Sequence, residues 1–318
     1  MRTLITGGSG FIGAEVARVL IGRGSTDVTL FDVRDCRQRL EDIGDRVTIV
    51  KGDVGIFSHV LDAVRSSRAE MIYHLGAMLS LPSEQDPPAA FHANAMGTFH
   101  IFEAARLLDV KRVVFASSTA TFGFDLPADP IDDLSLQRPQ TFYGACKLFG
   151  ENMGRFYRRK YGLDYRGVRF PSIVGPGVRS PGSVQYTSWV IEHAAKGVPF
   201  TIWVRPETRV PILYFKDAAL AIIALAESPP ERIKMVNYLL SGPRPTALEL
   251  VNLVRQKFPG AQIDFKVDDE IQLRLDNAMR PLDDRFAREE WGWKPTYGVD
   301  AMIDDFLAEL SQHPHRYA

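Results

Sequence analysis

The stretch Arg2-Thr3-Leu4-Ile5-Thr6-Gly7-Gly8-Ser9-Gly10-Phe11-Ile12-Gly13 decides the fold. A short apolar strand over residues 2–6 runs into a glycine loop, and a helical pattern of Ala and Val residues follows. The spacing of Gly7, Gly10 and Gly13 lets the backbone turn sharply and come close to a pyrophosphate. The start of the helix offers free N–H groups and the positive end of a dipole. The stretch therefore predicts a strand-loop-helix unit that binds a dinucleotide.

The same alternation of strand and helix continues through residue 170. We expect further strands, each short and apolar, at residues 28–31, 47–50, 70–75, 112–116 and 165–170, and a long helix over residues 89–108. Repeated units of this kind form a parallel sheet with helices on both faces, and ligands bind at its carboxyl edge. The predicted fold is α/β, with a Rossmann-type doubly wound parallel sheet.

Two aspartates follow predicted strands. Asp32 lies 19 residues beyond Gly13 and ends the second strand. A carboxylate there can accept both ribose hydroxyls of an adenosine and would repel a 2′-phosphate, which favours NAD over NADP. Arg34 could instead accommodate that phosphate, and Asp32 could also be a simple helix cap. Asp53 could meet the adenine amino group or cap the next helix.

Tyr143 and Lys147 are the candidate catalytic pair. They are four residues apart in Thr141-Phe142-Tyr143-Gly144-Ala145-Cys146-Lys147, so on a helix they share one face. An ammonium group one turn from a phenol favours the phenolate and should lower the pKa of Tyr143 towards neutrality. Such a tyrosine can exchange a proton with a substrate alcohol or carbonyl. Ser117-Ser118-Thr119 follows the fifth strand and brings hydroxyl groups to the same edge of the sheet.

The chain beyond residue 170 is irregular and rich in proline and glycine. We expect a helix over residues 184–196, a strand over 210–214, a helix over 217–226, and a helix over 246–258 with a capping box of Thr246 and Glu249. The predicted cofactor domain comprises residues 1–170 and about 211–237. Residues 171–210 and 238–318 would form a smaller, interleaved C-terminal substrate domain.

Composition limits the class of protein. The chain has 318 residues, of which 45% are hydrophobic, and a formal net charge of -1. This balance gives no reason to expect a nucleic acid or a membrane as partner. The two cysteines, Cys36 and Cys146, belong to no metal-ligand pair, and His313 and His315 lie in a polar tail. We expect no metal and a cytoplasmic location, since no signal sequence precedes the glycine loop.

These residues resemble the extended short-chain dehydrogenase/reductase superfamily, in its NAD-dependent epimerase/dehydratase group. The likeness rests on the glycine loop, Asp32, Asp53, Asn94-Ala95-Met96-Gly97-Thr98, Ser117-Ser118 and Tyr143-Gly144-x-x-Lys147. It implies Ser118, Tyr143 and Lys147 as catalytic residues and NAD as cofactor. The residues implied to bind the cofactor are Gly7, Gly10, Phe11, Ile12, Gly13, Asp32, Arg34, Asp53, Val54, Leu75, Gly76, Ala77, Asn94, Tyr143, Lys147, Phe170 and Ile173.

Within that group, the C-terminal half resembles the L-threonine 3-dehydrogenase branch. The similar segments are Tyr161-Gly162-Leu163-Asp164-Tyr165-Arg166, Glu207-Thr208-Arg209-Val210-Pro211 and Ala287-Arg288-Glu289-Glu290-Trp291-Gly292-Trp293. The chain departs from the branch at Val184, which replaces a threonine, and at Ala278, which aligns with a tryptophan. The residues implied on the substrate side are Ser80, Ser118, Thr119, Ser183 and Arg280. Arg280 suits a carboxylate or phosphate, or it forms a surface salt bridge with Asp283 or Asp284.

The leading functional hypothesis is a dehydrogenase that moves a hydride between NAD and a secondary alcohol of a small polar substrate, such as a threonine-like 3-hydroxy acid. A nucleotide-sugar epimerase or dehydratase with tightly bound NAD is the alternative, and a non-catalytic NAD sensor is a third reading. Apolar residues on several faces of the helix at Tyr143 and of the helix at residues 89–108 predict a homodimer, as the resemblance also implies.

Overall fold

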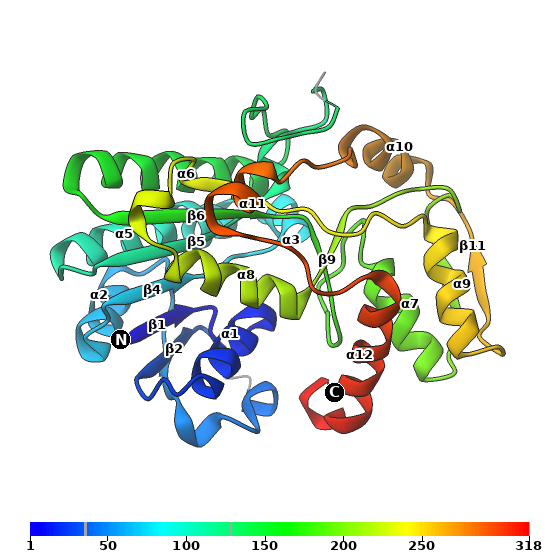
Figure 1. The fold of residues 1–318 in the computed structure, drawn as a ribbon, viewed down its shortest axis with the longest axis horizontal. Coiled ribbons are helices and arrows are strands. Elements are labelled where there is room, and N and C mark those ends of the chain that lie inside the picture. The colour runs from blue at the N-terminus through cyan, green and yellow to red at the C-terminus, as the bar shows by residue number, and fades with distance from the viewer. Residues whose placement is uncertain (35–36, 127–128, 318) are drawn as a thin grey trace.

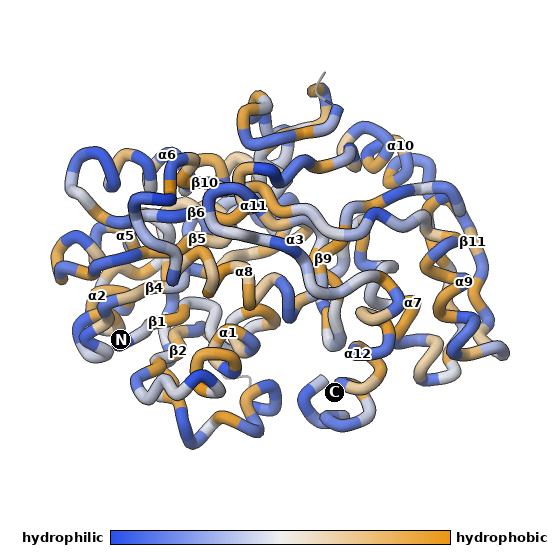
Figure 2. The backbone as a smooth tube through the Cα atoms, viewed as in Figure 1, coloured by the Kyte–Doolittle hydropathy of each residue, from blue (hydrophilic) through white to orange (hydrophobic). Residues whose placement is uncertain are grey.

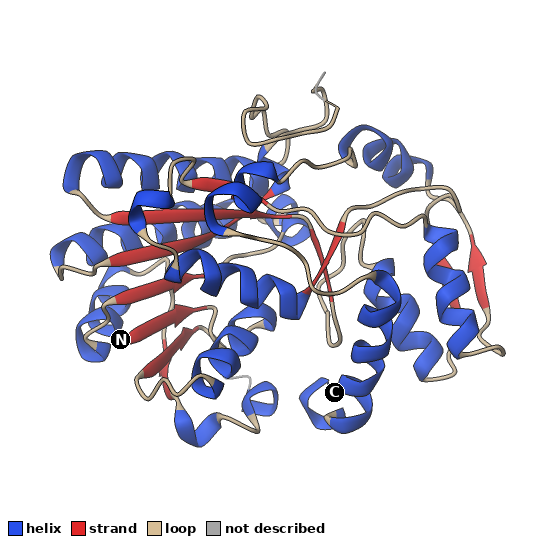
Figure 3. Ribbon diagram, viewed as in Figure 1, coloured by secondary structure: helices blue, strands red, loops and turns tan. Residues whose placement is uncertain are grey.

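A parallel sheet of seven strands forms the centre of the molecule, with helices on both of its faces (Figures 1 and 3). The structure is a computed structural model that describes residues 1–34, 37–126 and 129–317. Cys36 lies outside the described residues. The strands of the sheet, in spatial order, are β10 (Asn237–Leu239), β6 (Asp164–Phe170), β5 (Arg112–Ser118), β4 (Met71–His74), β1 (Thr3–Thr6), β2 (Val28–Asp32) and β3 (Thr48–Lys51).

The order of the strands reverses at β1. Thr6 at the end of this strand lies beside Phe31 of β2 on one side and beside His74 of β4 on the other. The chain moves outward from β1 to β3 and then returns to place β4 on the opposite side. Such a reversal opens a crevice at the carboxyl ends of the strands, where ligands bind in doubly wound sheets. The predicted fold class is confirmed.

Each face of the sheet has its own apolar core. Because neighbouring residues of a strand point to opposite faces, Ile5 packs with α1 and α8, whereas Leu4 packs with α2 and α5. Hydrophobic residues run along α1 and α8, as the colours of Figure 2 show. The covering helices are α1 (Phe11–Gly22) and α8 (Phe215–Glu227) on one face, and α2 (Phe57–Ser67), α5 (Gly97–Leu107) and α6 (Phe142–Tyr161) on the other.

The second half of the chain builds a smaller unit with a separate core, which includes Val190, Leu250 and Phe306. It lies at the right in Figure 1, beyond the carboxyl ends of the strands. Its strands form two parallel pairs, β7 (Ser172–Val174) with β9 (Ile212–Tyr214) and β8 (Phe200–Ile202) with β11 (Ile263–Phe265). Its helices are α7 (Tyr186–Ala195), α9 (Ala247–Lys257), α10 (Asp269–Ala278) and α12 (Val299–Gln312). Three further helices pack beside the large sheet: α3 (Ser80–Gln85) and α4 (Pro87–Ala90) contact α6, and α11 (Arg285–Trp291) contacts β10.

Three local features differ from the sequence-based expectation. The sheet has a seventh strand, β10, because three buried residues after Val236 pair with β6. The long helix expected over residues 89–108 consists of α4, a π-helical segment (Phe91–Met96) and α5. β5 extends to Ser118, so this residue ends the strand and does not follow it. The helix with the Thr246 and Glu249 capping box is confirmed. The division into two domains stays a prediction, and β10 straddles its last boundary.

Candidate active site

The glycine loop between β1 and α1 leaves no room for a side chain at Gly7 or Gly13. Gly7 has a φ of +65°, and a Cβ atom there would lie 2.8 Å from Cα of Gly76 in the loop after β4. A Cβ atom on Gly13 would lie 2.2 Å from the carbonyl oxygen of Gly7. Phe11 and Ile12 begin α1, whose N-terminus has no side-chain cap, so its N–H groups are open to an anion.

The carboxylate of Asp32 faces this loop. It accepts hydrogen bonds from the backbone N–H of Ser9 at 3.2 Å and of Arg34 at 3.1 Å. The Arg34 side chain is exposed beside it. Asp53 does not cap the next helix, because α2 begins only at Phe57. Its exposed carboxylate accepts the N–H of Gly55 instead, at 2.8 Å.

The loop after β4 is shaped by a buried amide. Asn94 is 3% exposed, and its side chain accepts the N–H of Met78 at 2.7 Å and donates to the Met78 carbonyl at 2.9 Å. The side-chain amide of Asn94 therefore fixes the loop of residues 75–80, which includes Leu75, Gly76 and Ala77. Val54 fills the space beside Gly97, whose Cβ position would lie 2.7 Å from the valine side chain. Phe170 is buried at the end of β6, and Ile173 is partly buried in β7.

Ser118, Tyr143 and Lys147 come together where β5 ends and α6 begins. The Ser118 hydroxyl group lies close enough to the Tyr143 phenol to lower the pKa of Tyr143. Lys147, one turn further along α6, lies 5.5 Å from the centre of the Tyr143 ring. Its ammonium group donates to the carbonyl of Ala116 in β5 at 2.7 Å. The structure thus assembles the three predicted catalytic side chains.

Two local interactions begin α6 at this position. The Thr141 side chain accepts the N–H of Gly144 at 3.0 Å and caps the helix. A Cβ atom on Gly144 would lie 2.3 Å from the Ala120 carbonyl oxygen, so glycine lets the helix start approach the segment after Ser118. The N–H of Phe142 also donates to Glu84 of α3 at 2.7 Å.

The predicted low pKa of Tyr143 is wrong for the protein alone. Burial raises the pKa of Tyr143 to about 12, and the nearby Ser118 hydroxyl group only partly opposes this rise. Burial also lowers the pKa of Lys147 to about 8. The sequence spacing predicts only the attraction between the two groups. In the folded protein, the loss of hydration on burial has the larger effect on both pKa values.

The predicted substrate-side residues come from four separate segments. Ser80 begins α3 and is exposed, and Thr119 is partly buried directly after Ser118. The carbonyl of Ser183 accepts the indole N–H of Trp203 at 2.8 Å. Ser80 and Thr119 lie on segments that contact the start of α6, whereas Ser183 and Arg280 belong to the smaller unit.

Arg280 does not pair with Asp283 or Asp284, as one reading of the sequence had it. Those aspartates pair with Arg285 and Arg288, and Arg280 lies 3.8 Å from the carboxylate of Asp129. Its Nε atom is buried and has no hydrogen-bond partner within the described part of the chain. Asp284 is not free to pair with Arg280, because its carboxylate also accepts the indole N–H of Trp293.

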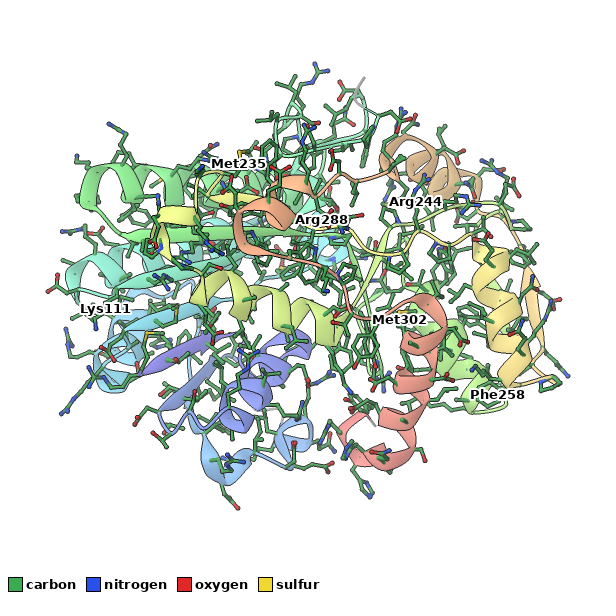
Figure 4. All side chains as sticks on the ribbon, viewed as in Figure 1. Lys111, Met235, Arg244, Phe258, Arg288 and Met302 are labelled. Atoms are coloured by element: carbon green, nitrogen blue, oxygen red, sulfur yellow. The ribbon has the colours of Figure 1, made fainter. Side chains whose placement is uncertain are left out.

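Arg244 resembles Arg280 in having a buried guanidinium nitrogen, and the sequence analysis did not identify it. It lies in the connection between β10 and α9, below α10 in Figure 4. It donates to the carbonyl of Met279 at 2.6 Å, while its buried Nε atom also lacks a partner among the residues described. Burial and the nearby Arg209 lower its pKa. An open cavity of about 250 Å³ is lined by Arg244, Met279, Arg209 and Arg205, among others. No motif marks Arg244, since its surroundings depend on contacts between segments that are distant in the sequence.

Two negative findings apply to residues 1–34, 37–126 and 129–317. Within these ranges, no three side chains of His, Cys, Asp or Glu gather as a metal ion would require. None of the helices found there combines the length and the apolar character needed to cross a bilayer.

Comparison with known proteins agrees with this geometry. Residues 3–237 match the model of the NAD dependent epimerase/dehydratase family. The mitochondrial L-threonine 3-dehydrogenase of Bos taurus is 30% identical over 308 residues, which cover 96% of this chain and 82% of the relative. A solved holo L-threonine dehydrogenase of Cupriavidus necator superposes with a TM-score of 0.90, at 30% identity over 98% of this chain and 100% of the other. The enzyme of Clostridium difficile gives 0.89, at 28% identity over 98% of both chains.

Proposed function

Because the chain belongs to the NAD-dependent epimerase/dehydratase family, as an enzyme of the extended short-chain dehydrogenase type, we propose that it oxidises the secondary alcohol of a threonine-like 3-hydroxy acid or a related hydroxy compound. One observation carries the proposal: Ser118, Tyr143 and Lys147 meet at the carboxyl edge of the sheet, where β5 ends and α6 begins. The reaction is a hydride transfer with a nicotinamide cofactor. The relatives named L-threonine dehydrogenases support the substrate class.

In the proposed mechanism, Tyr143 takes the proton of the substrate hydroxyl while the Ser118 hydroxyl group binds the same oxygen. When bound, the oxidised cofactor supplies the acceptor for the hydride that leaves the carbinol carbon, and its nicotinamide ring carries a positive charge. Lys147 stabilises the phenolate of Tyr143 through its ammonium group. Desolvation of Tyr143 opposes ionisation, so the positive charge of Lys147 is essential to the proton transfer.

We propose NAD as the cofactor. The tight glycine loop and the uncapped start of α1 fit a pyrophosphate, because Gly7 and Gly13 allow a backbone turn too close for any side chain and the N–H groups of α1 are open. The carboxylate of Asp32 at the end of β2 fits the adenosine ribose and disfavours a 2′-phosphate. Asp53 and Val54 are proposed to line the adenine side, and Phe170 and Ile173 the nicotinamide side.

We propose that Ser80, Thr119, Ser183 and Arg280 bind the substrate together with Ser118. A buried guanidinium nitrogen without a partner favours an anionic group, so Arg280 is assigned to the carboxylate of the substrate. Ala278 replaces a large ring of the threonine dehydrogenase branch, which leaves space for a longer substrate. The substrate is therefore expected to be a hydroxy acid at least as large as threonine.

The test is to follow the formation of NADH with purified protein, oxidised NAD and a series of 3-hydroxy acids that includes L-threonine. NADH should accumulate with at least one of them, and not when Tyr143→Phe replaces the wild type. A nucleotide-sugar epimerase or dehydratase would instead retain its NAD through purification and convert a sugar nucleotide without net NADH. That outcome would overturn the proposal.

We infer a homodimer from the exposed apolar residues on the helix at Tyr143 and its neighbour. Phe149 and Tyr161 of α6 are 39% and 44% exposed, and Phe91 and Leu107, at or near the ends of the π-helical segment and α5, are 48% and 47% exposed. A second copy would cover them. A cytoplasmic location stays a prediction.

A further inference from the structure

A cluster of buried charged side chains lies beneath the catalytic residues. Glu151 of α6 and Arg169 of β6 are each 1% exposed and form a bidentate pair, at 2.9 and 2.7 Å. The remaining guanidinium nitrogen of Arg169 donates to Asp133 at 2.9 Å. Charged groups are seldom buried so completely unless they are paired. The mechanism above uses none of these three residues.

The cluster connects the two segments that carry the reacting groups. The hydroxyl group of Ser117, the neighbour of Ser118 in β5, donates to Glu151 at 2.6 Å. Glu151 also accepts the side-chain amide of Gln137 at 3.0 Å, from the loop between Ser118 and Tyr143. One carboxylate thus holds the end of β5, the following loop and α6 together.

Glu151 also lies on the catalytic face of α6. Tyr143, Lys147 and Glu151 follow each other at intervals of four residues, so they share one side of the helix. Together, Glu151, Asp133 and Arg169 carry two carboxylates and one guanidinium group. Lys147 is the next cation along this face of the helix. Burial lowers the pKa of Lys147, whereas the neighbouring Cys146 and, to a smaller extent, Glu151 raise it.

We propose that Glu151 is a positioning residue for the reaction, which ties the strand end at Ser118 to α6 and keeps Lys147 in its ammonium form. This inference rests on the catalytic roles proposed above. The other ionisable groups near Lys147 are Tyr143 and Cys146 of α6 and His74 of β4. His74 carries no charge at neutral pH, because burial lowers its pKa to about 3. Burial raises the pKa of the Cys146 thiol, so Glu151 supplies the carboxylate among these groups.

The test compares the pH dependence of kcat in the wild type and in Glu151→Gln. Loss of the carboxylate should lower the pKa of Lys147, so the alkaline decline of kcat should move down by about one pH unit. The value of kcat at its optimum should fall about tenfold, while KM for NAD should change less than twofold. Glu151→Asp, which keeps the charge on a shorter side chain, should retain the wild-type alkaline limb. A wild-type limb in Glu151→Gln overturns the inference.

Ser117→Ala tests the tether without removing a charge, and it serves if Glu151→Gln fails to fold. It should lower kcat about three- to tenfold and leave the alkaline limb in place. Wild-type kcat in Ser117→Ala would overturn the positioning role. Glu290→Gln is the matched control, because Glu290 accepts the N–H of Lys234 and the hydroxyl group of Tyr238 away from the site. It should keep both kcat and the alkaline limb.

Tyr143→Phe separates failure of this inference from failure of the proposed function. If Tyr143→Phe is inactive while Glu151→Gln keeps the wild-type pH profile, only the role of Glu151 is wrong. If Tyr143→Phe keeps wild-type activity, the proposed function itself is wrong.

Discussion

At the scale of single residues, Tyr143 shows why a catalytic group cannot be assessed from its sequence neighbour alone. Lys147 is one turn away, yet burial raises the pKa of Tyr143 to about 12. Lys147 itself titrates near pH 8, since burial disfavours its charge. We expect the pair to depend on a further positive charge, which oxidised NAD would supply when bound.

We predict that Tyr143→Phe lowers kcat by about 10²–10⁴-fold while the Kd for NAD stays within a factor of two, because only the hydroxyl group transfers the proton. The ring remains to pack between Ser118 and Lys147. Steady-state kinetics and calorimetric titration of NAD would measure the two effects. Wild-type turnover in the variant would remove Tyr143 from the mechanism.

Asp32→Ala should weaken the binding of NAD about tenfold, which corresponds to the loss of hydrogen bonds to a charged group. The affinity for NADP should stay the same or improve, because the carboxylate no longer repels the 2′-phosphate. Titrations with both cofactors would give the ratio of the two Kd values. A wild-type preference for NADP, with Arg34 as its cause, would contradict this assignment.

At the scale of elements, α6 links catalysis to stability. Its first turn carries Tyr143, its second carries Lys147, and its third places Glu151 against Arg169. Asp133 completes the ion cluster from the preceding loop, and it also accepts the N–H of Leu239 in β10 at 2.6 Å. One oxygen of Asp133 is buried without a hydrogen-bond partner in the described ranges.

This unpartnered oxygen predicts a pH-dependent stability. Burial raises the pKa of Asp133 from 3.8 to about 7, although Arg169 opposes the rise and Glu151 and Asp132 add to it. Between these values the folded protein holds a proton that the unfolded chain releases, so this contribution to stability is complete below about pH 4 and lost by about pH 7.

Asp133→Asn removes this titration and keeps the shape of the side chain. Its free energy of unfolding, relative to that of the wild type, should therefore increase by about 1 kcal/mol or more between pH 4 and pH 7. Urea denaturation at a series of pH values would measure the difference. If the two stability curves run parallel across this window, Asp133 is ionised in the folded protein throughout.

At the scale of the whole molecule, α5 and α6 present apolar side chains that the smaller unit does not cover. We predict a homodimer of twice 35.6 kDa in solution at micromolar concentration. Phe149→Glu should shift the mass towards one chain, because it places a charge in the proposed interface. Light scattering of both proteins would measure this. A wild-type mass of 35.6 kDa would contradict the prediction.

The sequence alone determined the local features of this protein. The spacing of Gly7, Gly10 and Gly13, the strand before them and the pair Tyr143 and Lys147 predicted the sheet, the pyrophosphate cradle and the catalytic residues. The capping box at Thr246 was equally clear. Such features can be predicted because they depend on residues a few positions apart, where periodicity and backbone geometry act directly.

Only the tertiary structure decided the features that depend on burial and on contacts between distant segments. β10 became a seventh strand because β6 offered it a free edge. Arg280 faces Asp129 because its nearer aspartates already bind Arg285, Arg288 and Trp293. The Glu151 cluster joins β5, β6, α6 and a loop across up to 36 positions of sequence. The physical reason is shared: the energy of a buried charge or strand edge depends on what surrounds it in space.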